Sequence, residues 1–310
     1  MRIIRDYQFV DLPDRGATAA IGNFDGVHLG HRSVIELAQQ AAPDAPLGVV
    51  TFEPHPREYF APGAPPFRLM GREARAHRLE KIGVKRLYEL AFNSTLAGLS
   101  PEAFARDVLH EGLGLAHVVV GADFCFGKGR EGTAEDLVRF GAQYGFGVTI
   151  APLMARDELT VSSTAIREAL TRGAPREAAA MLGHWHRIDG PVISGEQRGR
   201  ELGFPTANMS IDGLHPPAFG VYAVLVDVLE GPHKGSYHGA ASIGTRPMFG
   251  ENKANIETYV FDFKGDLYGA PLSVGLVEHL RGEEKFNSLD ALIAQMGQDC
   301  DRARTILAAL

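Results

Sequence analysis

The chain has 310 residues, of which 45% are hydrophobic and 22% charged, and its formal net charge at pH 7 is -7. This length is sufficient for two domains with separate cores, and the composition is that of an ordinary globular protein. The acidic balance argues against a broad nucleic-acid-binding surface, which requires clustered positive charge. Two cysteines far apart, Cys125 and Cys300, indicate neither a disulfide framework nor a cysteine-rich zinc site, and we expect a cytoplasmic location without a membrane anchor.

The first predicted elements are a strand over 17–21 and an amphipathic helix over 32–42, and between them lies the sequence Gly-Asn-Phe-Asp-Gly-Val-His-Leu-Gly-His at 22–31. Glycines let the backbone turn sharply and approach a ligand, and the start of a helix offers unpaired N–H groups to an anion. His28 and His31 would share one face if the helix begins near them. Two imidazole donors there can hold phosphate oxygens while charge moves to a leaving pyrophosphate. The segment predicts a nucleotide-binding turn suited to adenylyl transfer, although glycines and histidines can also form an ordinary turn.

Strands and helices alternate as far as about residue 183. We predict strands at 47–52, 86–90, 117–120 and 147–150, and helices at 72–81, 101–109 and, with an interruption at 173–175, 166–182. This alternation is typical of a parallel, doubly wound sheet, which binds ligands at the carboxyl ends of its strands.

Two loops follow predicted strands at that edge. Thr-Phe-Glu-Pro-His-Pro at 51–56 ends its strand with two prolines and places His55 at the mouth, although an isolated histidine there is typical of any loop. In the segment 121–130, Asp123 follows a strand, where a carboxylate can accept a hydrogen bond from a ribose hydroxyl or a flavin group. Phe124 and Phe126 are equally compatible with packing in the core.

A third segment, Val-Ser-Ser-Thr-Ala-Ile-Arg at 161–167, opens a predicted helix. Serine and threonine at such positions commonly cap the helix. Arg167 lies three positions after Thr164 and can turn toward the same helix end, where it would add a charge-assisted hydrogen bond to bound phosphate.

The pattern changes near residue 183. From Ile188 onward, short alternating segments and turn residues predict an antiparallel barrel or sandwich, so we place the two domains at 1–183 and 184–310. Trp185 is expected to be a packing residue near this junction.

The second region contains a basic loop at 195–200, which follows a predicted strand at 190–194, and then Gly-Phe-Pro-Thr-Ala-Asn at 203–208. In an extended backbone, Thr206 and Asn208 point the same way, and their hydroxyl and amide oxygens suit a magnesium ion. The alternative is a polar turn that caps itself.

A further strand is predicted at 219–226, and another at 255–263, where Glu257 would share a face with Tyr259, Phe261 and Phe263. A carboxylate on an aromatic face costs free energy unless it has a partner or a role. Glu257 is therefore either a solvated residue near a strand end or a functional base. The chain closes with a helix that carries Leu289, Leu292, Ile293 and Met296 on one side.

The segment 22–31 resembles the HxGH signature of the nucleotidyltransferase superfamily. With 51–56, 121–130, 161–167 and 203–208, nearly the whole chain resembles the bifunctional prokaryotic riboflavin kinase/FAD synthetases. The resemblance implies an N-terminal Rossmann-like nucleotidyltransferase domain with a parallel sheet and a C-terminal antiparallel β-barrel riboflavin kinase domain with a terminal helix. The C-terminal domain would phosphorylate riboflavin to FMN, and the N-terminal domain would adenylylate FMN to FAD. ATP would be the co-substrate, with Mg²⁺ at both sites and no nucleic-acid or membrane partner.

The resemblance also implies roles for individual residues. In the N-terminal domain, His28 and His31 would be catalytic, ATP would contact Gly22, Asn23, Phe24, Asp25, Gly30, Asp123, Ser163, Thr164 and Arg167, and flavin would contact His55, Pro56 and Phe124. In the C-terminal domain, Glu257 would accept the proton of the riboflavin 5′-hydroxyl. ATP and Mg²⁺ would contact Gly195, Arg198, Gly199, Pro205, Thr206 and Asn208, with Thr206 and Asn208 as the metal ligands, and flavin would contact Arg246 and Phe249.

Three positions depart from the pattern of this family. Ser242 stands where Asn is common, Met248 where Thr is expected and Tyr259 where His is usual. These exchanges bear on the flavin pocket and the efficiency of the kinase. Two alternatives therefore stay open: an FAD synthetase with an impaired kinase barrel, and a non-catalytic flavin-binding protein.

Overall fold

The computed structural model describes residues 1–152, 161–195, 199, 202–248 and 251–310, with the backbone alone for 246–248 and 251–253. Contacts within the chain define two units. The first contains Met1–Pro65 and Arg72–Val161, and the second contains Pro66–Gly71 and Ser162–Leu310. The domain boundary at residue 183 remains a prediction, because such clustering reflects packing and not activity.

The first unit is built on a six-stranded parallel sheet, in the order β1-β4-β3-β2-β5-β6. Its strands are β1 (Arg2–Ile4), β2 (Thr18–Ile21), β3 (Leu47–Glu53), β4 (Arg86–Ala91), β5 (His117–Gly121) and β6 (Gly147–Ala151). The predicted parallel sheet is confirmed, and β1 was not predicted. Because the chain moves from β2 toward β4 and then returns to β5 on the other side of β2, the strand order reverses there. Ligand crevices form at such a reversal.

Helices cover both faces of this sheet. Helix α1 (Leu29–Ala41) packs on one face, where the Thr18 hydroxyl donates to the Ala38 carbonyl at 2.8 Å. The other face is covered by a π-helical stretch (Phe104–Gly112) and α6 (Ala134–Tyr144), which share a buried cluster with the strands. The remaining helices are α2 (Pro56–Phe60), α3 (Arg72–Lys81), α4 (Ser94–Ala97) and α5 (Pro101–Ala103). The helix predicted at 101–109 begins as expected, with Ser100 as its cap, but becomes π-helical from Phe104.

The second unit contains a six-stranded antiparallel half-barrel in the order β7-β12-β9-β10-β11-β8. Its strands are β7 (His186–Pro191), β8 (Thr206–Ser210), β9 (Gly220–Val228), β10 (Gly235–Met248), β11 (Glu251–Val260) and β12 (Pro271–Arg281). The chain after β7 meets β8 where the Ile193 N–H donates to the Asn208 carbonyl at 2.8 Å. The antiparallel architecture and the terminal helix α10 (Leu289–Leu307) were both predicted and are confirmed.

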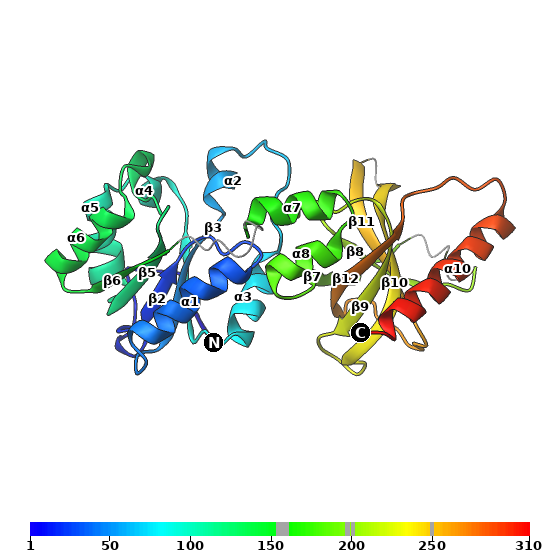
Figure 1. Cartoon of the computed structure of the whole chain (residues 1–310), viewed down its shortest axis with the longest axis horizontal. Coiled ribbons are helices and arrows are strands. Elements are labelled where there is room, and N and C mark those ends of the chain that lie inside the picture. The colour runs from blue at the N-terminus through cyan, green and yellow to red at the C-terminus, as the bar shows by residue number, and fades with distance from the viewer. Residues whose placement is uncertain (153–160, 196–198, 200–201, 249–250) are drawn as a thin grey trace. The chain divides into compact units, whose positions relative to one another are not determined.

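The half-barrel has one cluster inside and one outside. Val224, Val226 and Ile256 belong to the inner cluster, whereas α10 packs on the outer face through Ala303 and Leu307 (Figure 1). Trp185 packs against this outer cluster, as expected.

One expectation about β11 is wrong. The strand ends at Val260, and Asp262 has a positive φ of 57° that turns the chain. Phe263 therefore packs against the inner cluster, while Tyr259 and Phe261 lie in the outer one. Glu257 does not share a face with Phe263.

A short segment from the first half of the sequence belongs to the second unit. We call residues 66–71 the inserted strap. Arg68 forms a parallel bridge with Leu214, and its carbonyl accepts from the His215 N–H at 2.8 Å. The strap also contacts α7 (Ser163–Thr171), because Arg167 Nε donates to the Phe67 carbonyl at 2.6 Å. Helix α8 (Pro175–Leu182) follows α7. Among the helices of the described residues, none has the length and apolar character that crossing a membrane requires.

Candidate active sites

The segment after β2 places the two histidines of the HxGH motif face to face. His28 is the N-cap of α1, and its Nδ1 accepts from the His31 N–H at 3.2 Å. Their rings stack with centroids 3.6 Å apart and an interplanar angle of 15°. The prediction that the two side chains share a face at the start of the helix is therefore confirmed.

The backbone before this helix adopts conformations that are rare for most residues. Phe24, Gly26 and Val27 have positive φ angles of 51°, 88° and 44°. Such angles cost free energy for residues with a Cβ and persist only where the surroundings hold them. The Thr51 hydroxyl holds the turn by donating to the Asn23 carbonyl at 3.2 Å. Gly30 lets the helix backbone lie close to the His28 ring, because a Cβ at this position would be 3.2 Å from that ring.

Burial and the neighbouring His28 lower the pKa of His31 well below its usual range. His31 is therefore uncharged at neutral pH. His28 accepts a hydrogen bond at Nδ1, which leaves Nε2 as the ring nitrogen that can donate to a ligand.

Two of the predicted flavin contacts, His55 and Pro56, lie after β3. His55 caps α2 by accepting from the Arg57 N–H at 3.0 Å, and Pro56 is the first residue of that helix. Sequence reasoning missed the aromatic group beside them: the rings of Tyr59 and Phe60 lie 5.3 Å and 5.7 Å from that of Phe92. Phe60 is 70% exposed, so its ring is accessible to a planar ligand.

After β5, the structure shows which of the two phenylalanines, Phe124 or Phe126, packs in the core. Phe126 is buried in the core, whereas Phe124 is half-buried and stacks on it with centroids 5.5 Å apart. Asp123 is exposed at the end of the strand. Because β5 adjoins β2, Asp123 follows a strand next to the one that leads into the histidine turn.

The third predicted phosphate element belongs to the second unit. Ser162 is the N-cap of α7, and its hydroxyl accepts from the Ala165 N–H at 3.2 Å. Ser163 and Thr164 occupy the first turn, with Thr164 exposed. The guanidinium of Arg167 lies over the Phe67 ring, 5.4 Å from its centroid.

In the half-barrel, strand pairing brings separate motifs into one line. Glu257 of β11 pairs with Asn208 of β8 on one side and with Ser242 of β10 on the other, and Ser242 pairs with Val221 of β9. Directly paired residues point to the same face of a sheet. We call these four residues the cross-strand row. It lies on the outer face, because Val221 packs with the cluster under α10.

Among the residues predicted to bind ATP and Mg²⁺, Gly195 packs against Asn208, which is 7% exposed, and Gly199 packs near Thr206. The Oδ1 of Asn208 accepts from Asn255 at 3.5 Å, and a Cβ on Gly195 would lie 2.6 Å from the Nδ2 of Asn208. A Cβ on Gly199 would lie 2.4 Å from the Phe204 carbonyl oxygen and 3.5 Å from the Thr206 hydroxyl. Pro205 and Thr206 border a small cavity of about 80 Å³. The predicted residues Arg198 and Phe249, and the side chain of Arg246, lie outside the described residues.

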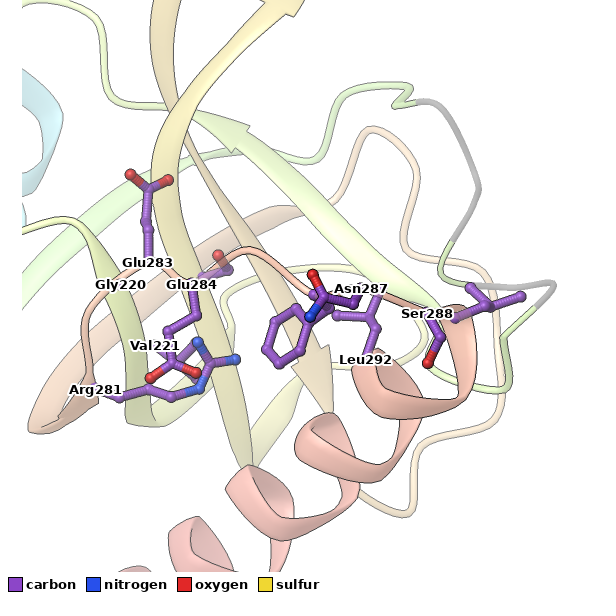
Figure 2. A pocket seen from close by; sticks show the side chains of 11 residues that line it. Gly220, Val221, Arg281, Glu283, Glu284, Asn287, Ser288 and Leu292 are labelled. Carbon is purple, nitrogen blue, oxygen red and sulfur yellow. The ribbon is translucent and has the colours of Figure 1, made fainter.

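A cavity of about 540 Å³ opens beside the cross-strand row. Val221 and Ser242 line it from the strands, and the segment between β12 and α10 completes it (Figure 2). The end of β12, the segment after it and the start of α10 contribute an aromatic ring, two leucines and several polar groups: Arg281, Glu283, Glu284, Phe286, Asn287, Ser288, Leu289 and Leu292. Apolar surfaces together with acid and amide groups suit a flat heteroaromatic ligand with hydrogen-bonding edges.

Most of these lining residues were missed by sequence reasoning, which gave residues 281 and 286 no role. Arg281 is held in place by Asp299 of α10, with Nε to Oδ2 at 3.0 Å, and its guanidinium lies 5.5 Å from the Phe286 ring centroid. Because Asp299 lies on α10, the position of Arg281 in the cavity depends on that helix. The sequence signal for this cavity was weak, because its lining residues come from three separated segments of the chain.

Comparisons with known proteins agree across the chain. A family model described as FAD synthetase matches residues 11–165, and one described as riboflavin kinase matches residues 182–307. A bifunctional riboflavin kinase/FMN adenylyltransferase from Pseudomonas fluorescens is 40% identical over 312 residues, with 99% of this chain and 98% of the relative covered. Its counterpart from Escherichia coli K12 is 37% identical, with 96% of each covered. A crystal structure of a macrolide-efflux protein from Streptococcus pneumoniae has a TM-score of 0.81 at 31% identity, with 96% of each chain covered.

Proposed function

The chain belongs to the family of bifunctional riboflavin kinase/FMN adenylyltransferases, and from this premise we propose how its two activities are divided. The protein is a transferase that phosphorylates riboflavin to FMN and adenylylates FMN to FAD, each with ATP. We assign adenylyl transfer to residues 1–183 and phosphoryl transfer to 184–310. The family models support this division: the one described as FAD synthetase covers the stacked histidines, and the one described as riboflavin kinase covers Glu257.

In adenylyl transfer, a phosphate oxygen of FMN attacks the α-phosphorus of ATP, and the bond to pyrophosphate breaks. The FMN phosphate is ionised at neutral pH because its second pKa is about 6, so no base is required. His28 and His31 stabilise the charge that moves to the leaving pyrophosphate, since fixed donors in a partly buried site need no reorganisation. The turn 22–25, Gly30 and Asp123 are proposed to bind ATP for this reaction, and the family resemblance also assigns ATP contacts to Ser163, Thr164 and Arg167.

The flavin of this reaction is proposed to contact His55, Pro56 and Phe124. The exposed ring of Phe60 extends that surface. An accessible aromatic ring supports this placement, because an isoalloxazine that stacked on it would be stabilised beyond simple burial of area.

In phosphoryl transfer, the riboflavin 5′-hydroxyl oxygen attacks the γ-phosphorus of ATP and ADP leaves. Glu257 accepts the hydroxyl proton, which requires the carboxylate to be within hydrogen-bond reach of that hydroxyl. The isoalloxazine ring is proposed to occupy the cavity beside the cross-strand row, with Arg246 and Phe249 as further flavin contacts. The placement of Glu257 next to Ser242, which lines the cavity, supports this role.

Mg²⁺ fits the oxygen donors of Thr206 and Asn208. The two side chains alternate on β8 so that they share a face, and Asn208 pairs directly with Glu257. Bound there with ATP, the ion would neutralise phosphate charge. Groups of three or more His, Cys, Asp or Glu side chains able to hold a metal are absent from the described residues, which is consistent with a magnesium ion that relies on phosphate oxygens and water. Gly195, Arg198, Gly199 and Pro205 are proposed to complete the nucleotide site.

We also place the protein in the cytoplasm, with ATP, riboflavin and FMN as its small-molecule partners and no nucleic acid or membrane. Both cysteines are free thiols, which supports a reducing compartment.

Incubation of the purified protein with Mg²⁺, ATP and either riboflavin or FMN, followed by chromatography of the products, tests the proposal. We expect FMN and then FAD from riboflavin, and FAD from supplied FMN. FAD from FMN without any FMN from riboflavin would indicate an impaired kinase barrel. Tight flavin binding without turnover would indicate a flavin carrier.

A further inference from the structure

We propose that Arg75 is a positioning residue for adenylyl transfer, which holds the loops after β2 and β3 in their working arrangement. The inference rests on the proposed assignment of that reaction to the turn 22–31. Arg75 lies on α3 and touches neither histidine, so its role is exerted through the backbone of the turn and through Glu53.

The Arg75 guanidinium joins three strands of the first unit. The residue is 3% exposed. Its Nη1 donates to the Asn23 carbonyl after β2 at 3.4 Å, and its Nη2 donates to Glu53 at the end of β3 at 3.0 Å and to Glu89 of β4 at 3.4 Å. A planar guanidinium with several fixed donors can make all three contacts at once, whereas a lysine ammonium is a compact charge with less reach.

The contact with Asn23 supports the histidine pair through Phe24, the next residue along the chain. Phe24 follows Asn23 with a positive φ of 51°, and its ring lies 5.1 Å from the ring of His31. The Asn23 carbonyl accepts from both Thr51 and Arg75, so two donors hold the strained turn. Loss of the Arg75 donor should let Phe24 relax and remove one support of the stacked histidine pair.

The contact with Glu53 acts on the other ligand loop. Glu53 is the last residue of β3 and is followed by Pro54 and His55. One guanidinium therefore links the turn proposed to hold the polyphosphate with the loop proposed to hold the flavin. In a displacement reaction, the attacking and leaving groups must be aligned, and misplacement of about 1 Å can cost about 100-fold in rate.

Glu89 provides the fixed anchor for this link. Its side chain is 1% exposed, and it is also paired with Arg5 and Arg72 at 3.1 Å and 2.5 Å. A buried carboxylate held by several cations keeps its charge, because those cations lower its pKa against the opposing effect of burial.

Arg72 offers a matched control for Arg75. It lies on the same helix and donates to the same carboxylate, and among the described residues its hydrogen bonds lead to Glu89 and not to the two loops. Its side chain is 36% exposed. Arg72→Met and Arg75→Met therefore remove the same charge from the same network, but only Arg75→Met releases the turn.

The experiment measures kcat and KM for FMN adenylylation, with riboflavin phosphorylation by the same preparation as an internal reference. We expect Arg75→Met to lower kcat about 10- to 100-fold with intact kinase activity, and Arg75→Lys to recover part of that loss. Arg72→Met should change kcat by less than about fivefold, as for a half-exposed ion pair. Thr51→Val, which removes the second donor to Asn23, should lower kcat in the same direction.

Melting temperatures separate positioning from stability. In Arg75→Met, Glu89 keeps Arg5 and Arg72 as partners, so the variant should stay folded, and kcat measured well below its melting temperature should still be low. Losses of kcat that follow the losses in melting temperature across Arg72→Met and Arg75→Met, or equal losses of kcat in the two variants, would overturn the inference. If variants of His28 and His31 left adenylylation intact, the assignment of the reaction to this turn would fail instead.

Discussion

The two units present their reactive groups in different ways. In the first unit, His28, His31, His55 and Asp123 lie in loops or at a helix start beyond the carboxyl ends of parallel strands. In the second, Asn208, Ser242 and Glu257 lie within antiparallel strands and meet through pairing. The loops need supporting side chains to fix their shape, whereas the strands fix their residues by register. The first site should therefore be sensitive to distant supporting residues, and the second to changes within the strands themselves.

The largest expected effect is on the second site. Glu257→Gln keeps the size and the position of the side chain but removes the proton acceptor, so FMN formation should fall about 10²- to 10⁴-fold. Adenylylation of supplied FMN should not change. Product chromatography with riboflavin or FMN as the starting flavin measures both. Glu278→Gln on β12, a carboxylate paired with Arg176, serves as control and should leave both activities unchanged.

The converse experiment breaks the first site alone. His31→Ala combined with His28→Asn should lower FMN adenylylation about 10²- to 10³-fold, the usual cost of losing fixed donors to developing charge. Asparagine is a favoured N-cap, so this choice retains the cap of α1, which is worth about 1 kcal/mol. The kinase activity should persist. An equal loss of FMN formation in a folded variant would contradict the proposed division of activities.

Gly195 tests whether close packing on Asn208 matters. In Gly195→Ala, the new Cβ would lie 2.6 Å from the Asn208 amide nitrogen and would displace that side chain. We expect the KM for ATP in riboflavin phosphorylation to rise about 10-fold or more, with adenylylation unaffected. Gly190→Ala is the matched control, because a Cβ there meets no atom within 4 Å. Similar KM values for the two variants would remove Asn208 from the nucleotide site.

The smallest effect concerns acid stability, since each unit contains a buried histidine. Burial, with the charges of His184 and His215, lowers the pKa of His186 in β7 to about 3, and the pKa of His31 is also lowered. As the pH falls below about 6.5, the unfolded chain binds protons at these histidines that the folded chain does not yet bind. The free energy of unfolding should therefore fall as the pH falls below about 6.5, by at most about 1.4 kcal/mol per pH unit for each histidine.

His186→Leu should flatten this dependence for the second unit. Thermal unfolding between pH 7.5 and 5, followed by circular dichroism, measures it. The variant should lose less stability on acidification than the parent chain, and parallel curves would show that His186 does not titrate as its burial indicates.

Local patterns in the sequence were sufficient for the histidine turn. The apolar strand, the glycines and the helical period of 32–42 all act over a few residues, and the structure confirms the turn and the start of α1 nearby. Similar local signals existed for α6, which was missed although Thr133 and Asp136 form a capping box at its start and Gly145 ends it.

Other features depend on contacts that a linear pattern does not contain. The cross-strand row joins residues from four strands, and its register follows from pairing along the whole half-barrel. The prediction for Phe263 was wrong because of a single residue, Asp262, whose positive φ ends the alternation of side chains between the two faces of the strand. Arg75 lies within the helix predicted at 72–81 and had no role in the sequence analysis, and only the folded sheet shows its carboxylate partners on β3 and β4.

The inserted strap affects how the protein can be truncated. The chain passes from the first unit to the second at residue 66, returns at 72 and leaves again at 162. A truncation that begins at 162 or 184 lacks the strap, so Leu214 loses its bridge and the His215 N–H loses its acceptor. A backbone donor left without an acceptor is costly unless water replaces it. Point substitutions can therefore isolate either activity more cleanly than fragments can, and a recombinant C-terminal fragment should be made with residues 66–71 grafted to its start.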